Sequence, residues 1–187
     1  MRMGARIALL GLGSNLGDRR AQLQAAVEAL PGVGVELIAC SSTYDTEPVG
    51  EVPDQPSFLN ACVRGQTSLE PLELLDAVKQ IERQLGRGRA RVRHGPREID
   101  IDVLMLGELE LRHERMTLPH EQLLSRRFVL VPALELDFEQ SLPDGRRLAD
   151  ALARLPPLSQ GVRWAGPPLS LAGERGPRAR SPRRRRQ

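Results

Sequence analysis

Hydrophobic residues recur along this chain with two different periods. Buried strands are predicted by nearly continuous apolar runs at 6–12, 35–44, 58–67 and 99–106. In two segments between these runs, apolar residues recur at i, i+3, i+4 and i+7, which predicts amphipathic helices. We expect the first helix to begin after an N-cap at Asp18 and to end before Pro31, and the second to begin at Pro71 and to end at Gly86. The first hundred residues therefore predict the order strand, helix, strand, strand, helix, strand.

The pattern after residue 107 is weaker. It predicts a short strand or hairpin near 109–111, a helix after Arg126 that is started or kinked near Pro132, and a last short helix over 148–155. Proline, glycine, serine and arginine dominate the end of the chain. We therefore expect one folded domain over 1–166 and a disordered, arginine-rich tail over 167–187.

The composition is that of a soluble globular protein, with 187 residues of which 40% are hydrophobic and 27% charged. We find no apolar run of about 18 residues to span a membrane and no export signal, so we expect a cytoplasmic protein. Because residues 175–187 hold seven arginines and no acid, the net charge of +3 becomes −4 for residues 1–174. An argument for nucleic-acid binding from overall charge therefore rests on the tail. Cys40 and Cys62 lack the spacing of a zinc site and are expected to be small buried hydrophobes.

Within the run 99–106, an apolar strand does not explain Asp100 and Asp102. Successive side chains of a strand alternate between its faces, so the two carboxylates point the same way, roughly 6 to 7 Å apart, while Ile101 and Val103 face the other layer. Their repulsion must be neutralised by a cation or by arginines, and hard oxygen ligands suit Mg²⁺. For the two aspartates alone, a strand at the margin of a sheet with one solvated face is the alternative.

An arginine-rich loop precedes this strand. Residues 87–97 contain five arginines and no apolar period, which alone is typical of a solvated surface loop or a nucleic-acid patch. Cations that bind polyphosphate next to acids that bind Mg²⁺ form the two halves of a metal-nucleotide site. The position of the loop directly before Asp100 favours that interpretation.

Other polar features are candidates for binding. The glycine-rich segment 11–18 joins a strand to a helix and is either a phosphate cradle or a structural turn, because it matches neither common nucleotide motif. Segment 45–56 has three prolines and is a long loop of the kind that forms lids. Asn60 lies in an apolar strand and needs hydrogen-bond partners, and His120 is either a capping side chain or a ligand.

Taken together, these segments resemble the 6-hydroxymethyl-7,8-dihydropterin pyrophosphokinase family of folate biosynthesis. The resemblance covers about 5–165, and its most specific motif is Gly-Pro-Arg-Glu-Ile-Asp-Ile-Asp at 95–102. The supporting motifs, in the same order and spacing, are 11–18, Tyr-Asp-Thr-Glu-Pro at 44–48, Gln-Pro-Ser-Phe-Leu-Asn at 55–60 and Leu-Pro-His at 118–120. The resemblance implies a single-domain α+β fold with a ferredoxin-like core, in which helices flank an antiparallel sheet.

The activity that the resemblance implies is transfer of the intact β,γ-pyrophosphate of ATP to the pterin hydroxymethyl group, which leaves AMP. By likeness, Asp100 and Asp102 hold two Mg²⁺ ions, and Arg87 and Arg97 are catalytic cations. The pterin would be bound by Thr46, Val49, Phe58, Asn60 and Phe128, with the two phenylalanines on either side of it. ATP would face Glu82, Arg89, Arg97, Arg115, His120 and Arg126.

The chain departs from the family pattern at three positions. Several members carry tryptophan where this chain has His94, proline is common at Glu47, and some members have a long cationic side chain at Ala90. Because 45–56 and 86–96 are expected to close over the nucleotide, these changes bear on loop closure, and their effect stays open.

Two functions are therefore weighed. The first is the pyrophosphokinase, with ATP and hydroxymethyl-dihydropterin as its substrates, no requirement for nucleic acid or a membrane, and a monomeric state. The alternative is a ferredoxin-like RNA-binding module that uses the basic loop and tail. Such sheets present aromatic residues on two central strands, whereas the runs here offer Phe58 alone, and residues 1–174 are net acidic.

Overall fold

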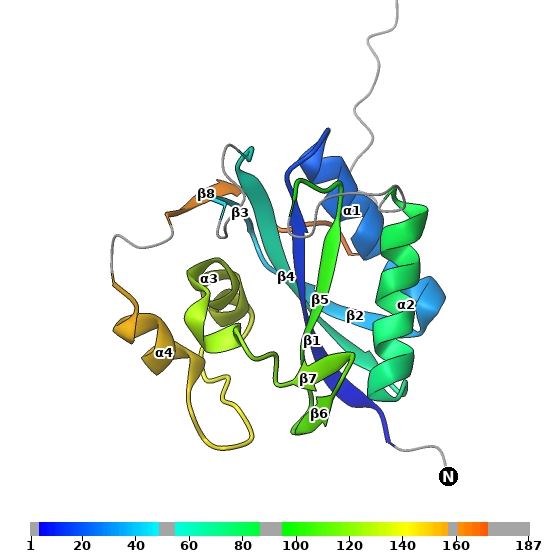
Figure 1. Cartoon of the computed structure of the whole chain (residues 1–187), viewed down its shortest axis with the longest axis vertical. Coiled ribbons are helices and arrows are strands. Elements are labelled where there is room, and N and C mark those ends of the chain that lie inside the picture. The colour runs from blue at the N-terminus through cyan, green and yellow to red at the C-terminus, as the bar shows by residue number, and fades with distance from the viewer. Residues whose placement is uncertain (1–3, 49–54, 87–94, 157–160, 172–187) are drawn as a thin grey trace, which may run out of the picture.

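A six-stranded antiparallel sheet lies at the centre of the protein (Figure 1). The computed structural model describes residues 4–48, 55–86, 95–156 and 161–171. The strands of the sheet are β1 (Arg6–Ser14), β2 (Val35–Cys40), β3 (Thr43–Thr46), β4 (Phe58–Thr67), β5 (Asp100–Leu106) and β8 (Val162–Gly166). Their order is β5-β1-β4-β3-β8, and β2 also pairs with β4. The two longest strands, β1 and β4, are therefore central, and β5 and β8 lie at the edges.

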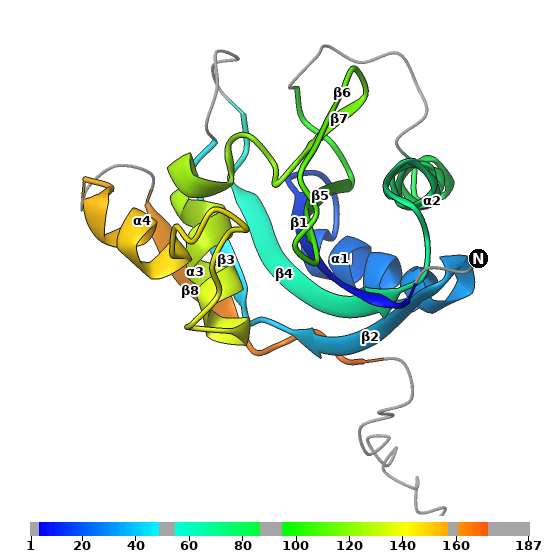
Figure 2. The ribbon, with the colours of Figure 1, turned by 90° about the horizontal axis from the view of Figure 1, so that it is seen from below.

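Helices cover both faces of this sheet (Figure 2). α1 (Arg19–Ala29) and α2 (Pro71–Gln84) pack on one face, and α3 (Arg127–Leu136) and α4 (Leu148–Arg154) lie on the other. Alternate residues of β1 divide between the two cores, because Leu10 and Leu12 pack with α1 and α2 whereas Leu9 packs with α3. A strand buried on both faces is apolar throughout, which explains why the run at 6–12 shows no alternation.

The helix boundaries follow the predicted signals. Asp18 caps α1, since its side chain accepts a hydrogen bond of 3.0 Å from the backbone N–H of Ala21. Pro71 is the first residue of α2, and Pro132 lies inside α3. The predicted hairpin is present as β6 (Leu111–His113) and β7 (Met116–Leu118), and β4 coincides with the run at 58–67. In the described part of the chain, no helix is long and apolar enough to cross a membrane.

Two strand predictions are wrong at their boundaries. β1 continues through Gly11 and Gly13 to Ser14, so these glycines belong to the strand, and the turn begins after it. The expected strand at 35–44 is two strands, β2 and β3, separated at residues 41–42. The break has a physical cause in α3. The carboxylate of Glu135 accepts hydrogen bonds from the backbone N–H of Ser42 at 2.9 and 3.0 Å and from its hydroxyl at 2.8 Å, in place of a partner strand.

The end of the described chain is also more ordered than predicted. β8 was not expected, and it pairs with β3 from Thr43 to Thr46. The expectation of disorder from 167 onward is wrong for 167–171, because Leu169 is only 3% exposed and belongs to the main core. Residues 172–187, which hold most of the predicted tail, lie outside the described residues.

Candidate active site

The central strand β1 carries two glycines where its neighbours carry polar side chains. Gly13 pairs with Asp100 on β5 and with Asn60 on β4, and Gly11 pairs with Asp102. Residues paired across an antiparallel sheet project to the same face, so the glycines leave a gap between the aspartates and Asn60. A Cβ atom on Gly13 would lie only 2.9 Å from Asn60 Oδ1. The two glycines therefore form the floor of a cavity.

This first cavity lies between the sheet and α3, and it encloses about 710 Å³, part of which is open to solvent. Thr46, Phe58, Asn60 and Phe128, the described members of the predicted pterin site, all line it. Asn60 is buried, and its Nδ2 donates a hydrogen bond of 2.6 Å to Thr46 Oγ1, so β4 and β3 are joined inside the cavity. Further lining comes from Arg97, Asp100, Asp102 and Arg126.

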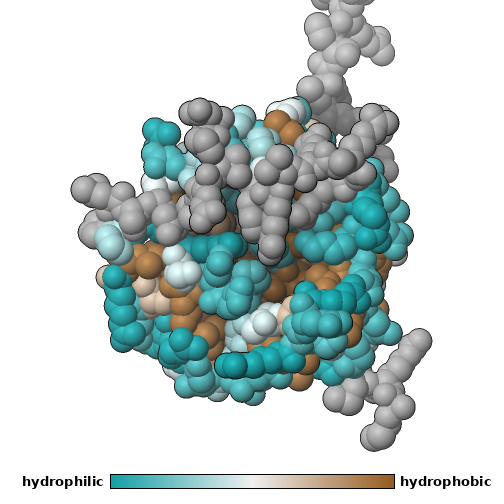
Figure 3. Space-filling view, in the orientation of Figure 1, coloured by the Kyte–Doolittle hydropathy of each residue, from teal (hydrophilic) through white to brown (hydrophobic). Residues whose placement is uncertain are grey.

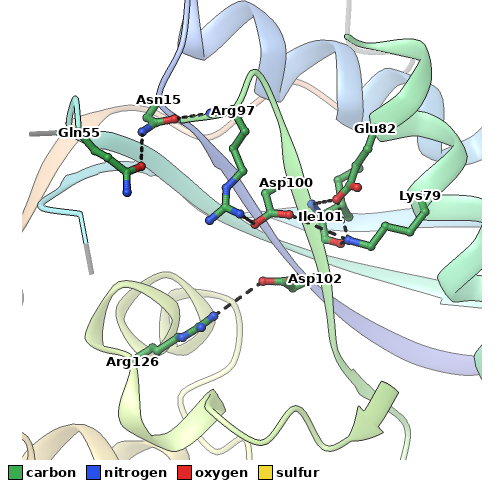
Figure 4. A network of polar contacts seen from close by, with 9 residues as sticks. All are labelled: Asn15, Gln55, Lys79, Glu82, Arg97, Asp100, Ile101, Asp102 and Arg126. Atoms are coloured by element: carbon green, nitrogen blue, oxygen red, sulfur yellow. Dashed lines mark hydrogen bonds and ion pairs between the residues drawn. The ribbon is translucent and has the colours of Figure 1, made fainter. Parts of the chain in front are cut away.

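The two aspartates face this cavity, as strand alternation predicted. Ile101 is fully buried on the opposite face, whereas the side chains of Asp100 and Asp102 are 17% and 35% exposed. Arg97 lies 3.2 Å from Asp100, and Arg126 lies 3.9 Å from Asp102 (Figure 4). β5 is an edge strand, but the face that carries its aspartates lines a cavity and is not simply solvated.

Both arginines also cover aromatic rings. The guanidinium carbon of Arg97 lies 5.4 Å from the ring centre of Phe58, and that of Arg126 lies 5.5 Å from the ring centre of Phe128. These are cation–π distances. Each arginine thus connects one aromatic wall of the first cavity to one aspartate.

A second cavity meets the first at Asp102. Predicted nucleotide ligands Arg115 and His120 line it, together with Lys79. Arg115, next to β7, forms an ion pair with Asp76 on α2, so the hairpin and the helix are connected across this cavity. Asp102 lines both cavities and therefore stands between an aromatic pocket and a polar cleft whose lining includes both basic and acidic side chains.

Burial and mutual charge perturb the titratable groups around this junction. Burial, and then the charge of Asp100, raises the pKa of Asp102 above its usual value of 3.8, although Lys79, His120 and Arg126 oppose the shift. Burial lowers the pKa of His120, against the attraction of Asp102, and this favours the neutral imidazole near pH 7. Burial is thus the main perturbation at this junction, and the repulsion between the two aspartates adds to it for Asp102.

A network of polar contacts fixes the backbone that carries the aspartates (Figure 4). Glu82 on α2 is 2% exposed, and its carboxylate accepts hydrogen bonds from the backbone N–H of Ile101 at 2.7 Å and from Lys79 at 2.8 Å. Asn15 accepts a hydrogen bond of 2.7 Å from the backbone N–H of Arg97 and donates to the carbonyl of Pro56 at 3.2 Å. Burial raises the pKa of Glu82, and Lys79 opposes that shift.

Sequence reasoning missed the positioning role of Lys79 and Asn15. Lys79 is the only lysine of the chain and lies three residues before Glu82 on a helix, a spacing that allows an ion pair. Asn15 lies in the glycine-rich segment 11–18, whose glycines predict a turn and give no indication of a role for Asn15. Predicted residues Val49, Arg87 and Arg89 lie outside the described residues, as do Ala90 and His94.

Residues 9–138 match the family model for 7,8-dihydro-6-hydroxymethylpterin-pyrophosphokinase, HPPK. The chain belongs to the HPPK family. It is 43% identical over 148 residues to a pyrophosphokinase of Pseudomonas aeruginosa, named 2-amino-4-hydroxy-6-hydroxymethyldihydropteridine pyrophosphokinase, covering 79% of this chain and 90% of that protein. It is 46% identical over 155 residues to the protein of the same name from Methylorubrum extorquens, covering 80% of this chain and 94% of that one.

Longer proteins also contain an HPPK-like part. The chain is 41% identical over 128 residues to the folate synthesis bifunctional protein of Arabidopsis thaliana, covering 68% of this chain but only 26% of the plant protein. A crystal structure of Plasmodium falciparum HPPK-DHPS with pterin and p-hydroxybenzoate is similar with a TM-score of 0.62 and 16% identity, covering 82% of this chain and 42% of that one. That likeness supports the fold alone. The chain thus spans about a quarter of the first protein and less than half of the second.

The donor set of this HPPK chain fits Mg²⁺ better than a transition metal. Among the described residues, no three or more His, Cys, Asp and Glu side chains are grouped so that they could hold a metal ion by themselves. Mg²⁺ is usually held by one or two carboxylates, with water and substrate phosphates as the other ligands. Asp100 and Asp102 supply such a pair beside a cleft whose lining includes Lys79 and Arg115.

Proposed function

We propose that this chain transfers the β,γ-pyrophosphate of ATP to the hydroxymethyl group of 6-hydroxymethyl-7,8-dihydropterin. The hydroxymethyl oxygen attacks the β-phosphorus and loses its proton to solvent. The bond from that phosphorus to the oxygen bridging to the α-phosphorus breaks, and AMP leaves with that oxygen. The proposal rests mainly on the meeting of two chemically different cavities at Asp102. A transfer between two substrates requires such adjacency, because both reacting atoms must be held in contact.

The first cavity suits a flat, polar heterocycle. Phe58 from β4 and Phe128 from α3 offer aromatic surfaces for stacking. The amide of Asn60 and the hydroxyl of Thr46 offer hydrogen-bonding groups for the edge of the ring, and Val49 is proposed to contribute backbone contacts from the adjoining loop. A buried polar site of this kind rejects analogues that leave its groups unpaired.

The second cavity suits a nucleotide with its phosphates at Asp102. Arg115, His120 and Lys79 line it, and we assign them to the nucleotide together with Arg126. Glu82 is proposed to act through Lys79 and the β5 backbone, since its carboxylate bonds both. Arg87, Arg89 and Arg97 are proposed as further phosphate ligands, with Arg87 and Arg97 stabilising the charge that develops during transfer.

Asp100 and Asp102 are proposed to hold two Mg²⁺ ions. When bound, Mg²⁺ supplies positive charge for the phosphates and lowers the pKa of the attacking hydroxyl. Burial, and then the charge of Asp100, raises the pKa of Asp102, and a cation bound at the junction would offset both effects, which supports this assignment. Arg97 and Arg126, which lie against the aspartates, would then be available to the phosphates.

The finer structural assignment is a ferredoxin-like core. It is supported by β1, β2, β4 and β5, whose order β5-β1-β4-β2 with α1 and α2 on one face follows the βαββαβ pattern. We also propose that the protein works as a cytoplasmic monomer. The RNA-binding alternative is not favoured, because helices cover both faces of the sheet, whereas an RNA-binding sheet presents one face to the bases.

The proposal is tested by measuring AMP release from ATP with and without hydroxymethyl-dihydropterin and Mg²⁺. AMP should form only when all three are present, in equal amount to the pterin diphosphate. The variant Asp100→Asn should lose activity, whereas Asp144→Asn, which alters an exposed acid in a surface turn, should retain it. Release of ADP, or AMP formation that does not depend on the pterin, would contradict the proposal.

A further inference from the structure

Segment 167–171, which we call the C-terminal strap, passes beside α1 (Figure 1) and is hydrogen-bonded to it at both of its ends. At one end both terminal nitrogens of Arg20 lie 3.1 Å from the carbonyl oxygen of Pro167, and one of them also donates to the next carbonyl at 3.3 Å. At the other end, Gln24 and Ser170 exchange two hydrogen bonds of 3.0 Å each. Between these ends, Leu169 is buried in the main core. The strap is therefore held by polar and apolar contacts together.

The strap anchors an edge strand that has little to hold it otherwise. β8 has five residues, of which Arg163, Trp164 and Ala165 are exposed, and Trp164 keeps 65% of its surface in solvent. Edge strands of this length with few buried side chains contribute little apolar burial of their own. β8 runs directly into the strap at Gly166, so the contacts of the strap with α1 fix one end of β8.

Arg20 connects the strap to β3 as well. One of its two terminal nitrogens, Nη1, donates a hydrogen bond of 3.0 Å to Thr43 Oγ1, at the start of β3, as well as reaching Pro167. Thr43 Oγ1 in turn lies 3.3 Å from the carbonyl oxygen of Gly166 and is placed to donate to it. A single guanidinium thus joins α1, β3 and the strap. β3 has only four residues, so this junction and its pairing with β8 make up much of what holds it on the side away from β4.

The other end of β3 is a wall of the first cavity. Thr46 pairs with Val162 of β8, and its hydroxyl accepts the 2.6 Å hydrogen bond from Asn60. The next residue, Glu47, also lines the cavity, and its backbone N–H lies 3.4 Å from the carbonyl oxygen of Gly161. Pairing with β8 therefore makes β3 an interior strand, whose other edge pairs with β4 and so brings Thr46 beside Asn60.

From these contacts we propose that the C-terminal strap is a positioning element for the pterin pocket. By fixing β8 against β3, it holds Thr46 and Asn60 in the geometry that binds the pterin edge, and it leaves the nucleotide cleft unaffected. The inference rests on the proposed function. It goes beyond family membership, because β8 and the strap lie outside the residues that match the family model, 9–138.

The test uses three full-length variants. Arg20→Leu removes the junction with β3, and Gln24→Leu loosens the far end of the strap without touching β3. Arg146→Leu is a matched control, because the side chain of Arg146 bonds only Asp144 among the described partners. The KM for pterin should rise about fivefold in Arg20→Leu and about threefold in Gln24→Leu, because Thr46 and Asn60 would be displaced from the edge of the pterin. The KM for ATP and kcat should stay within about twofold, and the control should match the wild type.

Two structural readouts accompany the kinetics. Trp164 is the only tryptophan of the chain, so its fluorescence reports on β8 alone, and quenching by acrylamide should increase in both strap variants. Amide exchange should quicken across 43–46 and not in β5.

The outcomes separate the two proposals. A wild-type chain that makes no AMP refutes the proposed function, and the inference with it. An active wild type whose pterin KM is unchanged in both strap variants, or whose ATP KM rises equally, refutes the inference alone. An effect of Arg20→Leu without any effect of Gln24→Leu also overturns it, because Arg20 then acts on Thr43 directly and the strap has no part.

Discussion

Replacing Asp102 by asparagine is expected to stabilise the empty protein while abolishing its activity. The raised pKa of Asp102 means that the folded state holds the proton of this carboxyl more tightly than the unfolded chain does. The contribution to stability is thus complete below the usual pKa of 3.8 and is lost as the pH rises through the higher folded value. At pH 7 the ionised side chain therefore costs folding free energy, and asparagine removes that cost without a change in size.

The magnitude follows from the geometry of the strand. Two carboxylates at alternate strand positions, roughly 7 Å apart, repel by about 0.6 kcal/mol at the dielectric constant of water and about 2.4 kcal/mol at an effective value of about 20. Arg126, 3.9 Å away, offsets part of this repulsion, and the side chain of Asp102 is 35% exposed, so solvent screens the remainder. We expect Asp102→Asn to raise the free energy of unfolding at pH 7 by about 1 kcal/mol.

Urea denaturation at several pH values, with and without Mg²⁺, measures this effect. Without Mg²⁺ the advantage of the variant should shrink toward zero as the pH falls to about 4. With Mg²⁺ at about ten times its dissociation constant, the wild type should gain about 1.4 kcal/mol, whereas the variant should gain much less. AMP formation by the variant should fall at least about a thousandfold. A variant that is less stable than the wild type at pH 7 without Mg²⁺ would refute the reasoning, because it would make the carboxylate a structural group.

Three further predictions concern the surroundings of the site. Gly13→Ala should raise the KM for pterin about tenfold, because the new Cβ would lie 2.9 Å from the amide oxygen of Asn60. Steady-state kinetics with each substrate varied in turn will show whether the KM for ATP is unchanged. Tyr44 is the only tyrosine, and its pKa, measured by absorbance, should be about 12. The free energy of unfolding should therefore fall as the pH rises from 10 to about 12. Glu135→Gln should lower this pKa only partly, because burial is a larger cause of the shift than Glu135. Lys79→Met should lower the free energy of unfolding, measured by urea denaturation, by about 2 kcal/mol, because it leaves the carboxylate of Glu82 buried without its cation. Adding Glu82→Gln should recover part of this loss, and equal losses in the single and double variants would contradict the pairing.

The parts of the site that local periodicity determines were predictable. Alternation along one strand was enough to place Asp100 and Asp102 on a common face, opposite Ile101, and the helix signals at Asp18 and Pro71 needed only neighbouring residues. Each of these is a property of a short segment, whatever the rest of the chain does.

The function of the glycines was not predictable in that way. Gly11 and Gly13 form a cavity floor only because β1 lies between β5 and β4 in a particular register, which places Gly13 between Asp100 and Asn60. Register is a long-range property, and a glycine pair after an apolar run is equally compatible with a turn.

The strap was missed for a different reason. Composition averaged over the end of the chain indicates disorder, and a single leucine, Leu169, does not alter that average. Its burial depends on the main core, which exists only in the folded protein, and on Arg20 and Gln24, which lie about 150 residues earlier in the chain.

The ion pairs of the candidate site differ from the structural pair beside them, and the difference bears on what the site does. Lys79 Nζ lies 2.8 Å from Glu82 Oε1, and Glu82 is buried, so this ion pair is fixed in place. Arg97 lies 3.2 Å from Asp100, a somewhat longer contact, and Arg126 lies 3.9 Å from Asp102, which is too far for a direct hydrogen bond. The ion pair of Asp102 can therefore exchange its cation at less cost than that of Asp100. Because Asp102 also lines both cavities, this spacing supports the proposal that Asp102 receives another cation during the reaction.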